Sequence, residues 1–123
     1  MKNEKLCAMT ISQLVEQFVV LALDQFKAEL LGKIAKYNRC YRAITAIGDE
    51  LKRRPGDQRT ALLSLLTHQN AQVRLMAAEL TLGVARSEAC ATLQEIWDNK
   101  EFPQAAFAMG TLMALERGTR KPI

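Results

Sequence analysis

A chain of 123 residues with 49% apolar and 24% charged side chains has the composition of one globular domain and not of a disordered segment. Its longest apolar run, Phe18 to Leu23, is far shorter than the roughly 20 residues that a membrane-spanning helix needs. The net charge is +4, and the three cysteines form no closely spaced pair, as expected for reduced thiols and not for a disulfide framework. We therefore expect a cytoplasmic protein with no membrane partner.

Two long helices are predicted in the first half of the chain. Thr10 and Gln13 have the spacing of a capping box, which starts a helix that runs into the mid-twenties. A turn is expected between Asp24 and Lys33. The second helix carries apolar residues at helical spacing and ends before Pro55 and Gly56; these residues are Ile34, Tyr37, Tyr41, Ile44, Ile47 and Leu51. Residues 1–9 precede the capping box and are expected to be a flexible tail.

Four shorter helices are predicted in the second half. Their start signals are three N-capping side chains and one proline at a first helical position, namely Asp57, Asn70, Ser87 and Pro103. The last helix is expected to stop before Gly118, where a glycine can adopt the left-handed conformation of a C-cap. Few glycines, prolines and aromatic residues argue against strands. We predict an all-α fold, with one domain over residues 10–118 and a flexible tail over residues 119–123.

One stretch of the chain resembles a repeat of the HEAT or armadillo type. Residues 61–66 are rich in leucine, and the next helix opens with Val73-Arg74 and the small pair Ala77-Ala78. This resemblance implies a short right-handed α-α superhelix of about three helical hairpins. It also implies that Arg74 bonds back to the turn or to the adjacent repeat. The positions that carry the repeat are Asn70, Val73, Arg74, Ala77, Ala78 and Leu80.

Nearly the whole chain is similar to a small bacterial family of uncharacterised helical-repeat domains. The stretches that match are residues 14–18, 36–39, 50–54 and 73–78. The resemblance implies a fold and a bacterial source but no activity, because one fold hosts many functions.

The sequence offers no set of residues for catalysis or for a cofactor. His68 is the only histidine, and it falls in a predicted loop without an orienting partner nearby. Cys7, Cys40 and Cys90 are too scattered for a zinc site, and no glycine-rich phosphate loop is present. We therefore expect a protein that is not an enzyme and that binds no cofactor or metal.

The positive charge is concentrated in residues 27–54, which hold eight basic and three acidic side chains. Such a segment is either a solvated helix face or a surface for a partner or a phosphate backbone. The candidate residues for this surface are Lys36, Arg39, Arg42, Arg53, Arg54 and Arg59.

The last predicted helix is apolar on every side, although the end of a helical solenoid usually carries a polar face. Either the chain itself buries this helix, or a homodimer or another partner covers it. The candidate interface residues are Met109, Leu112 and Met113. Together these features favour a non-catalytic protein–protein interaction module of the bacterial cytoplasm, an adaptor or an inhibitor or immunity-type partner. Nucleic-acid binding through residues 27–54 is the alternative.

Overall fold

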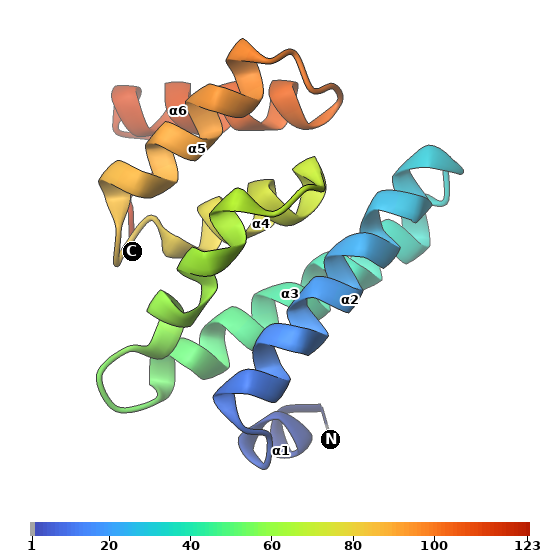
Figure 1. The fold of residues 1–123 in the computed structure, drawn as a ribbon, viewed down its shortest axis with the longest axis vertical. Coiled ribbons are helices and arrows are strands. Elements are labelled where there is room, and N and C mark those ends of the chain that lie inside the picture. The colour runs from blue at the N-terminus through green and yellow to red at the C-terminus, as the bar shows by residue number, and fades with distance from the viewer. Residues whose placement is uncertain (1) are drawn as a thin grey trace. The chain divides into compact units, whose positions relative to one another are not determined.

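The computed structural model describes residues 2–123 and contains six α-helices, one 3₁₀ helix and no strand among them (Figure 1). This confirms the predicted all-α class. The chain divides into two compact units, Met1–Ala61 and Leu62–Ile123, and each unit is described by itself. No helix among the described residues is long and apolar enough to cross a membrane.

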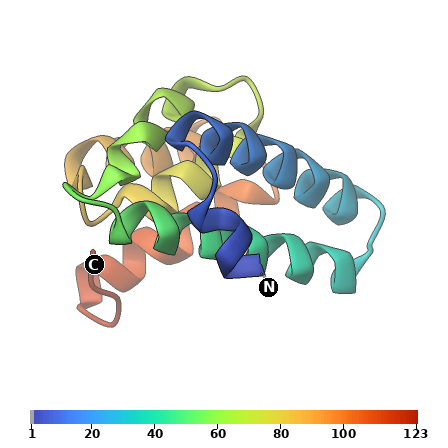
Figure 2. The ribbon, with the colours of Figure 1, turned by 90° about the horizontal axis from the view of Figure 1, so that it is seen from below.

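The first unit is a helical hairpin with a short helix before it. Its elements are α1 (Lys2–Cys7), α2 (Ile11–Leu30) and α3 (Ile34–Arg53). The capping box is confirmed: the Gln13 amide donates to the Thr10 hydroxyl at 3.1 Å, and the Gln13 side chain accepts from the Thr10 amide at 2.8 Å. Helices α2 and α3 lie side by side, joined by a tight turn at one end of the hairpin (Figure 2). The turn falls at the end of the predicted window, so α2 is longer than expected.

The buried stripe of α3 differs from the predicted one. Cys40, Ile44, Ile47 and Leu51 are buried, and their spacing places them on one side of the helix. Ile34 and Tyr41 lie about 100° away from this stripe on a regular helix, and the structure leaves both exposed. Other residues on α2 complete the core of this unit; they are Leu14, Phe18, Ala22 and Ala28.

The beginning of the chain is a helix where we expected a flexible tail. The guanidinium group of Arg54 donates to the carbonyl oxygens of Leu6, at 3.0 Å, and Met9, at 2.7 Å. Leu6 lies in the last turn of α1 and Met9 in the turn that follows it. The carbonyls at the C-terminal end of a helix carry negative partial charge, so a cation beside them is favourable. Arg54 thereby fastens the end of α1 to the end of α3.

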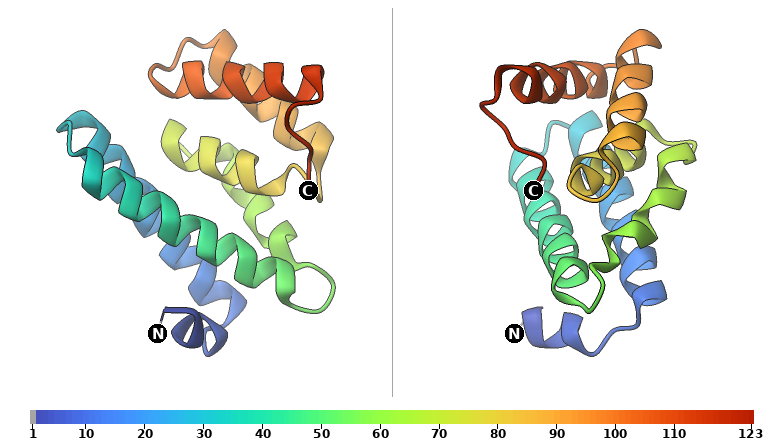
Figure 3. Two further views of the ribbon diagram at one scale, coloured as in Figure 1. Left: turned by 180° about the vertical axis from the view of Figure 1, so that it is seen from behind. Right: turned by 90° about the vertical axis from the view of Figure 1, so that its left-hand side faces the viewer.

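The second unit contains the rest of the helices. These are η1 (Gln58–Thr67), a 3₁₀ helix that begins in the first unit, and then α4 (Ala71–Thr81), α5 (Arg86–Asp98) and α6 (Gln104–Arg117). Helices α4, α5 and α6 pack on one another (Figure 3). Asn70 caps α4 as predicted, because its side-chain oxygen accepts from the amides of Gln72 and Val73.

One of the predicted N-caps is wrong. Helix α5 begins at Arg86, one residue before Ser87, and no side chain caps it. Asp57 does cap η1, because its carboxylate accepts from the Arg59 amide at 3.4 Å. Asp57 has a φ of 50°, and the same carboxylate pairs with the guanidinium group of Arg59 at 2.7 Å.

Small side chains allow the helices of the second unit to approach closely. The buried core has large residues beside alanines and consists of Leu75, Ala78, Leu82, Ala89, Leu93, Ile96, Ala105, Ala108 and Leu115. Leu80, expected on the buried face of α4, is only half-buried. The side-chain amide of Gln104 donates to that of Gln72 at 3.0 Å, so this buried polar pair is satisfied.

The end of the chain is attached to the second unit. Helix α6 ends at Gly118, whose φ of 77° forms the predicted left-handed C-cap. The guanidinium group of Arg120 then donates to the Glu79 carboxylate and to the Thr111 hydroxyl. Residues 119–120 are thus hydrogen-bonded to α4 and α6, where the sequence predicted a flexible tail.

Replacing Leu93 by alanine tests the core of the second unit. Leu93 is fully buried, so we expect Leu93→Ala to lower the free energy of unfolding by roughly 2–5 kcal/mol through lost burial and a cavity. Met113→Ala, at a 40% exposed position, is the matched control and should change it by less than about 0.5 kcal/mol. Urea denaturation measures both, and equal losses would contradict the assignment of Leu93 to the core.

Candidate functional site

Three of the six predicted basic residues are occupied by ion pairs within the first unit. Glu50 pairs with Arg53 at 2.8 Å and with Arg54 at 3.0 Å, and Arg59 is buried against Asp57. The hydrogen bonds from Arg53 and Arg54 lower the pKa of the Glu50 carboxyl from its ordinary value, in spite of its burial. These arginines hold turns and helix ends together, so little of their charge is available to a phosphate backbone.

Lys36, Arg39 and Arg42 remain as exposed cations on α3, with no ion pair to a side chain of residues 5–123. They follow one another at three-residue steps, which drift around the helix. The structure therefore reduces the predicted surface to a loose group of three charges.

The end of the α2–α3 hairpin carries the largest exposed aliphatic side chains of the first unit. Leu30, Leu31 and Ile34 are 67%, 68% and 73% exposed. Exposed lysines lie on both sides of them in the chain. We call this surface the hairpin tip; it consists of Leu30, Leu31, Ile34, Lys27, Lys33 and Lys36. The signal in the sequence is a pair of leucines before Gly32 and an isoleucine soon after it, outside the buried stripes of both helices.

The hairpin tip is held in one conformation by backbone hydrogen bonds. Gly32 has a φ of 67°, and its amide donates to the Glu29 carbonyl oxygen at 3.2 Å. The Lys33 amide donates to the Ala28 carbonyl oxygen at 2.8 Å, which completes a Schellman motif. A glycine adopts this left-handed conformation without steric cost. The apolar residues beside it are therefore presented on a fixed turn.

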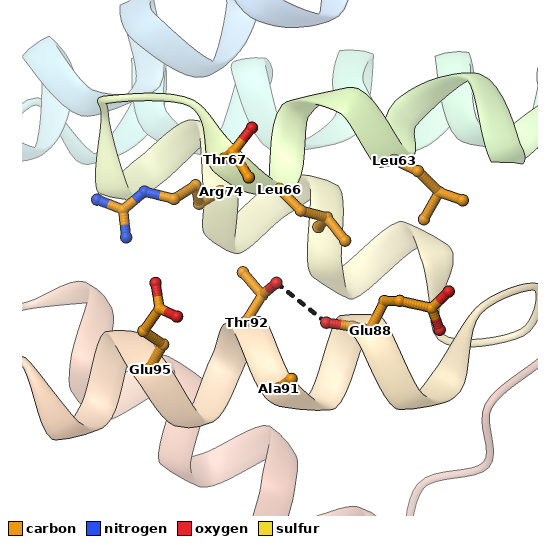
Figure 4. Close-up of a pocket in the computed structure, with 8 residues that line it drawn as sticks. All are labelled: Leu63, Leu66, Thr67, Arg74, Glu88, Ala91, Thr92 and Glu95. Carbon is orange, nitrogen blue, oxygen red and sulfur yellow. Dashed lines mark hydrogen bonds between the residues drawn. The ribbon is translucent and has the colours of Figure 1, made fainter.

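A groove of about 560 Å³ lies in the second unit (Figure 4). One wall is formed by Leu63 and Leu66 of η1, and the other by one face of α5. The short side chains of Ala91 and Thr92 leave space opposite the leucines. Glu88, Glu95, Thr67 and Arg74 also line the groove. The groove is therefore lined by apolar side chains, which we call its floor (Leu63, Leu66 and Ala91), and by the carboxylates of α5.

Arg74 forms the polar end of this groove. Its guanidinium group donates to the His68 carbonyl oxygen at 2.7 Å and to both carboxylate oxygens of Glu101, at 2.8 and 2.7 Å. A further bond at 3.3 Å reaches the Gln69 carbonyl oxygen. These bonds to Arg74 lower the pKa of the Glu101 carboxyl, whereas burial alone would raise it. The bond to the turn is the one that the resemblance to helical repeats implied.

The titratable side chains do not form a catalytic arrangement in the described part of the chain. The Nδ1 atom of His68 accepts a hydrogen bond from the Asn70 amide at 3.0 Å, so the imidazole helps to form the turn before α4. Burial raises the pKa of the Cys40 thiol, as for a cysteine that acts as a small core residue. Among the described side chains, those of residues 5–123, no three of His, Cys, Asp or Glu gather where they could hold a metal ion.

The predicted interface residues on α6 face different surroundings. Leu112 packs against the core of the second unit, and Met109 is half-buried. Met113 is exposed, as is Phe107 on the same helix. The chain itself therefore covers part of α6, one of the two alternatives left by the sequence.

The comparisons assign the chain to a family of all-helical domains without an assigned function. Residues 12–116 match the family described as Domain of unknown function (DUF2019), and the chain belongs to it. It is similar to the protein RPA1889 from the bacterium Rhodopseudomonas palustris CGA009, whose crystal structure has been solved. The two are 47% identical over 96% of this chain and 98% of that one, with a TM-score of 0.93. No curated protein matches the chain.

Removing the charge of Glu101 tests the bridge to Arg74. Because the pKa of Glu101 is lowered in the folded protein, the bridge stabilises the fold above the ordinary glutamate pKa of about 4.3 and is lost as the pH falls through the lower value. We expect wild type to be more stable than Glu101→Gln at neutral pH, with an advantage that shrinks below about pH 4. Urea denaturation across this pH range measures it. A difference that stays constant down to the acid limit would contradict the assignment.

Proposed function

We propose that this protein is a non-catalytic protein-interaction module of the bacterial cytoplasm, an adaptor or an inhibitor or immunity-type partner. The hairpin tip carries the proposal, because three neighbouring aliphatic side chains are more than two-thirds exposed. Exposed apolar clusters with a polar rim are typical of protein-binding surfaces. The Schellman turn adds to this, since a surface fixed before binding loses less conformational entropy.

The pKa shifts of the titratable groups also support a role in binding and not in catalysis. Perturbed pKa values often mark catalytic groups. Over residues 5–123, however, the groups with shifted pKa values are one buried thiol and six partners in three ion-pair clusters around Glu50, Asp57 and Glu101. Each cluster joins a turn or a helix end, which is a structural task.

We further propose that the pairs η1–α4 and α5–α6 are successive hairpins of the HEAT or armadillo type, as in a right-handed superhelix. Support comes from hydrogen bonds between positions one repeat length apart. Gln72 bonds to Gln104 and Glu79 bonds to Thr111, and each pair is separated by 32 residues. Stacked repeats place equivalent positions side by side, so bonds at a constant offset are expected of them.

Photo-crosslinking tests whether the hairpin tip binds protein. A photoreactive phenylalanine analogue at Leu31, expressed in the source bacterium, should give discrete protein adducts on irradiation. The same analogue at Glu16, an exposed position on α2, is the matched control and should give none. Equal labelling at both positions, or no adduct at either, would contradict the proposed function.

Nucleic-acid binding remains the second candidate, favoured by the exposed Lys36, Arg39 and Arg42 beside the exposed Tyr41. With the other three arginines in ion pairs, we expect binding to oligonucleotides no tighter than about 10⁻⁴ M at physiological salt, the weak limit of non-specific binding. Fluorescence anisotropy measures it. A tighter complex that weakens steeply with salt and is lost in Arg39→Ala/Arg42→Ala would favour this second function instead.

A further inference from the structure

The groove of the second unit is acidic and apolar at the same time. Glu88 and Glu95 lie two helical turns apart on the same face of α5, about 10 Å along the helix, and both are exposed. The single cation of the groove, Arg74, is already neutralised by Glu101. The floor consists of Leu63, Leu66 and Ala91. At about 560 Å³ the groove falls within the range of binding sites, roughly 300–1,000 Å³.

The hairpin tip is basic where the groove is acidic, and both surfaces contain apolar side chains. Its three lysines stand against two carboxylates, Asp24 and Glu29, and both of these are half-buried. Its three aliphatic side chains project from a turn that is held by backbone hydrogen bonds. Lys27 and Lys36 lie before and after the aliphatic residues in the chain, and Lys33 lies between Leu31 and Ile34. The tip therefore combines apolar and basic side chains, as the groove combines apolar and acidic ones.

We propose that the hairpin tip of one copy of this protein docks into the groove of the second unit of another copy. This inference rests on the proposed function and names the partner of its binding surface. Leu31 and its aliphatic neighbours cover the floor at Leu63 and Leu66, and the lysines approach Glu88 and Glu95. Burial of the aliphatic surface supplies the attraction, and the charges set the orientation and the rate of encounter.

Each copy carries one hairpin tip and one groove. Reciprocal contacts between two copies would make a twofold dimer, whereas a single contact between successive copies is heterologous and gives rings or open chains. The contact does not involve Met113, which separates it from an interface built on α6. It also predicts that association rises with protein concentration and weakens at high salt, because the lysines and glutamates at the rim are exposed.

Sedimentation velocity with two complementary variants tests the proposal. Leu31→Glu places a negative charge on the hairpin tip, and Glu88→Lys/Glu95→Lys reverses the charge of the groove, so each variant loses one of the two binding surfaces. All three positions are exposed, so both variants should fold. Wild type should associate between micromolar and near-millimolar concentration, and each variant alone should stay monomeric. A mixture of the two variants should regain a one-to-one complex, because one partner keeps its groove and the other keeps its tip. Met113→Glu is the control and should associate like wild type.

Several outcomes would overturn the proposal. These are a wild type that stays monomeric at near-millimolar concentration, a mixture of variants that does not associate, and loss of association in Met113→Glu but not in Leu31→Glu. Adducts of the Leu31 analogue with a different protein, together with a monomeric wild type, would overturn this inference and leave the proposed function standing. Binding of anionic phospholipid vesicles by a monomeric wild type, lost in Leu31→Glu, would assign the tip to a membrane surface and overturn it as well.

Discussion

The second unit depends on a single guanidinium group. Arg74 is bonded to the turn that precedes α4, through His68 and Gln69, and to Glu101, which follows α5. One side chain therefore fixes the end of η1 relative to the end of α5. A charged group that is largely removed from water is tolerated only when its hydrogen bonds are satisfied. Arg74 therefore requires both the carbonyls of the turn and the Glu101 carboxylate as partners. The groove exists because these two helix ends are held in position while Ala91 and Thr92 are too short to fill the space between them.

The same principle operates in the first unit and determines which surface is left free. Glu50 forms ion pairs with Arg53 and Arg54, and Arg54 also donates hydrogen bonds to carbonyls at the end of α1. Charge that could have served a polyanionic ligand is used to join helix ends. What stays available is the far end of the hairpin, where the turn at Gly32 places apolar residues in water. Burial of such residues is favourable by roughly 25 cal/mol per Å², which is the physical basis of the binding surface that we propose.

The sequence correctly predicted those helix ends that depend only on residues close together in the chain. Thr10 with Gln13, Asn70 and Gly118 mark helix ends because their hydrogen bonds or backbone conformation involve residues close in the chain. Asp57 also caps as predicted, and the same carboxylate pairs with Arg59. Ser87 has the same local preference and does not cap, because α5 begins one residue before it. The basic surface was overestimated because counting charges does not show that Glu50 neutralises its neighbours. The hairpin tip was missed because Ile34 and Tyr41 fit a helical period, and only the packing of Cys40 shows where the buried stripe lies. The groove lies between η1 and α5, and the sequence alone does not show that these two helices are neighbours.

Association through the hairpin tip and the groove, as we propose, can be tested most directly by NMR. The measurement is a dilution series of ¹⁵N–¹H correlation spectra of the wild-type protein from near-millimolar to low micromolar concentration. We expect concentration-dependent shifts confined to two sets of amides, those around Leu30–Ile34 and those along η1 and the Glu88–Glu95 face of α5. Shifts centred on Phe107 and Met113 of α6, or spectra that do not change over the whole series, would contradict the proposal.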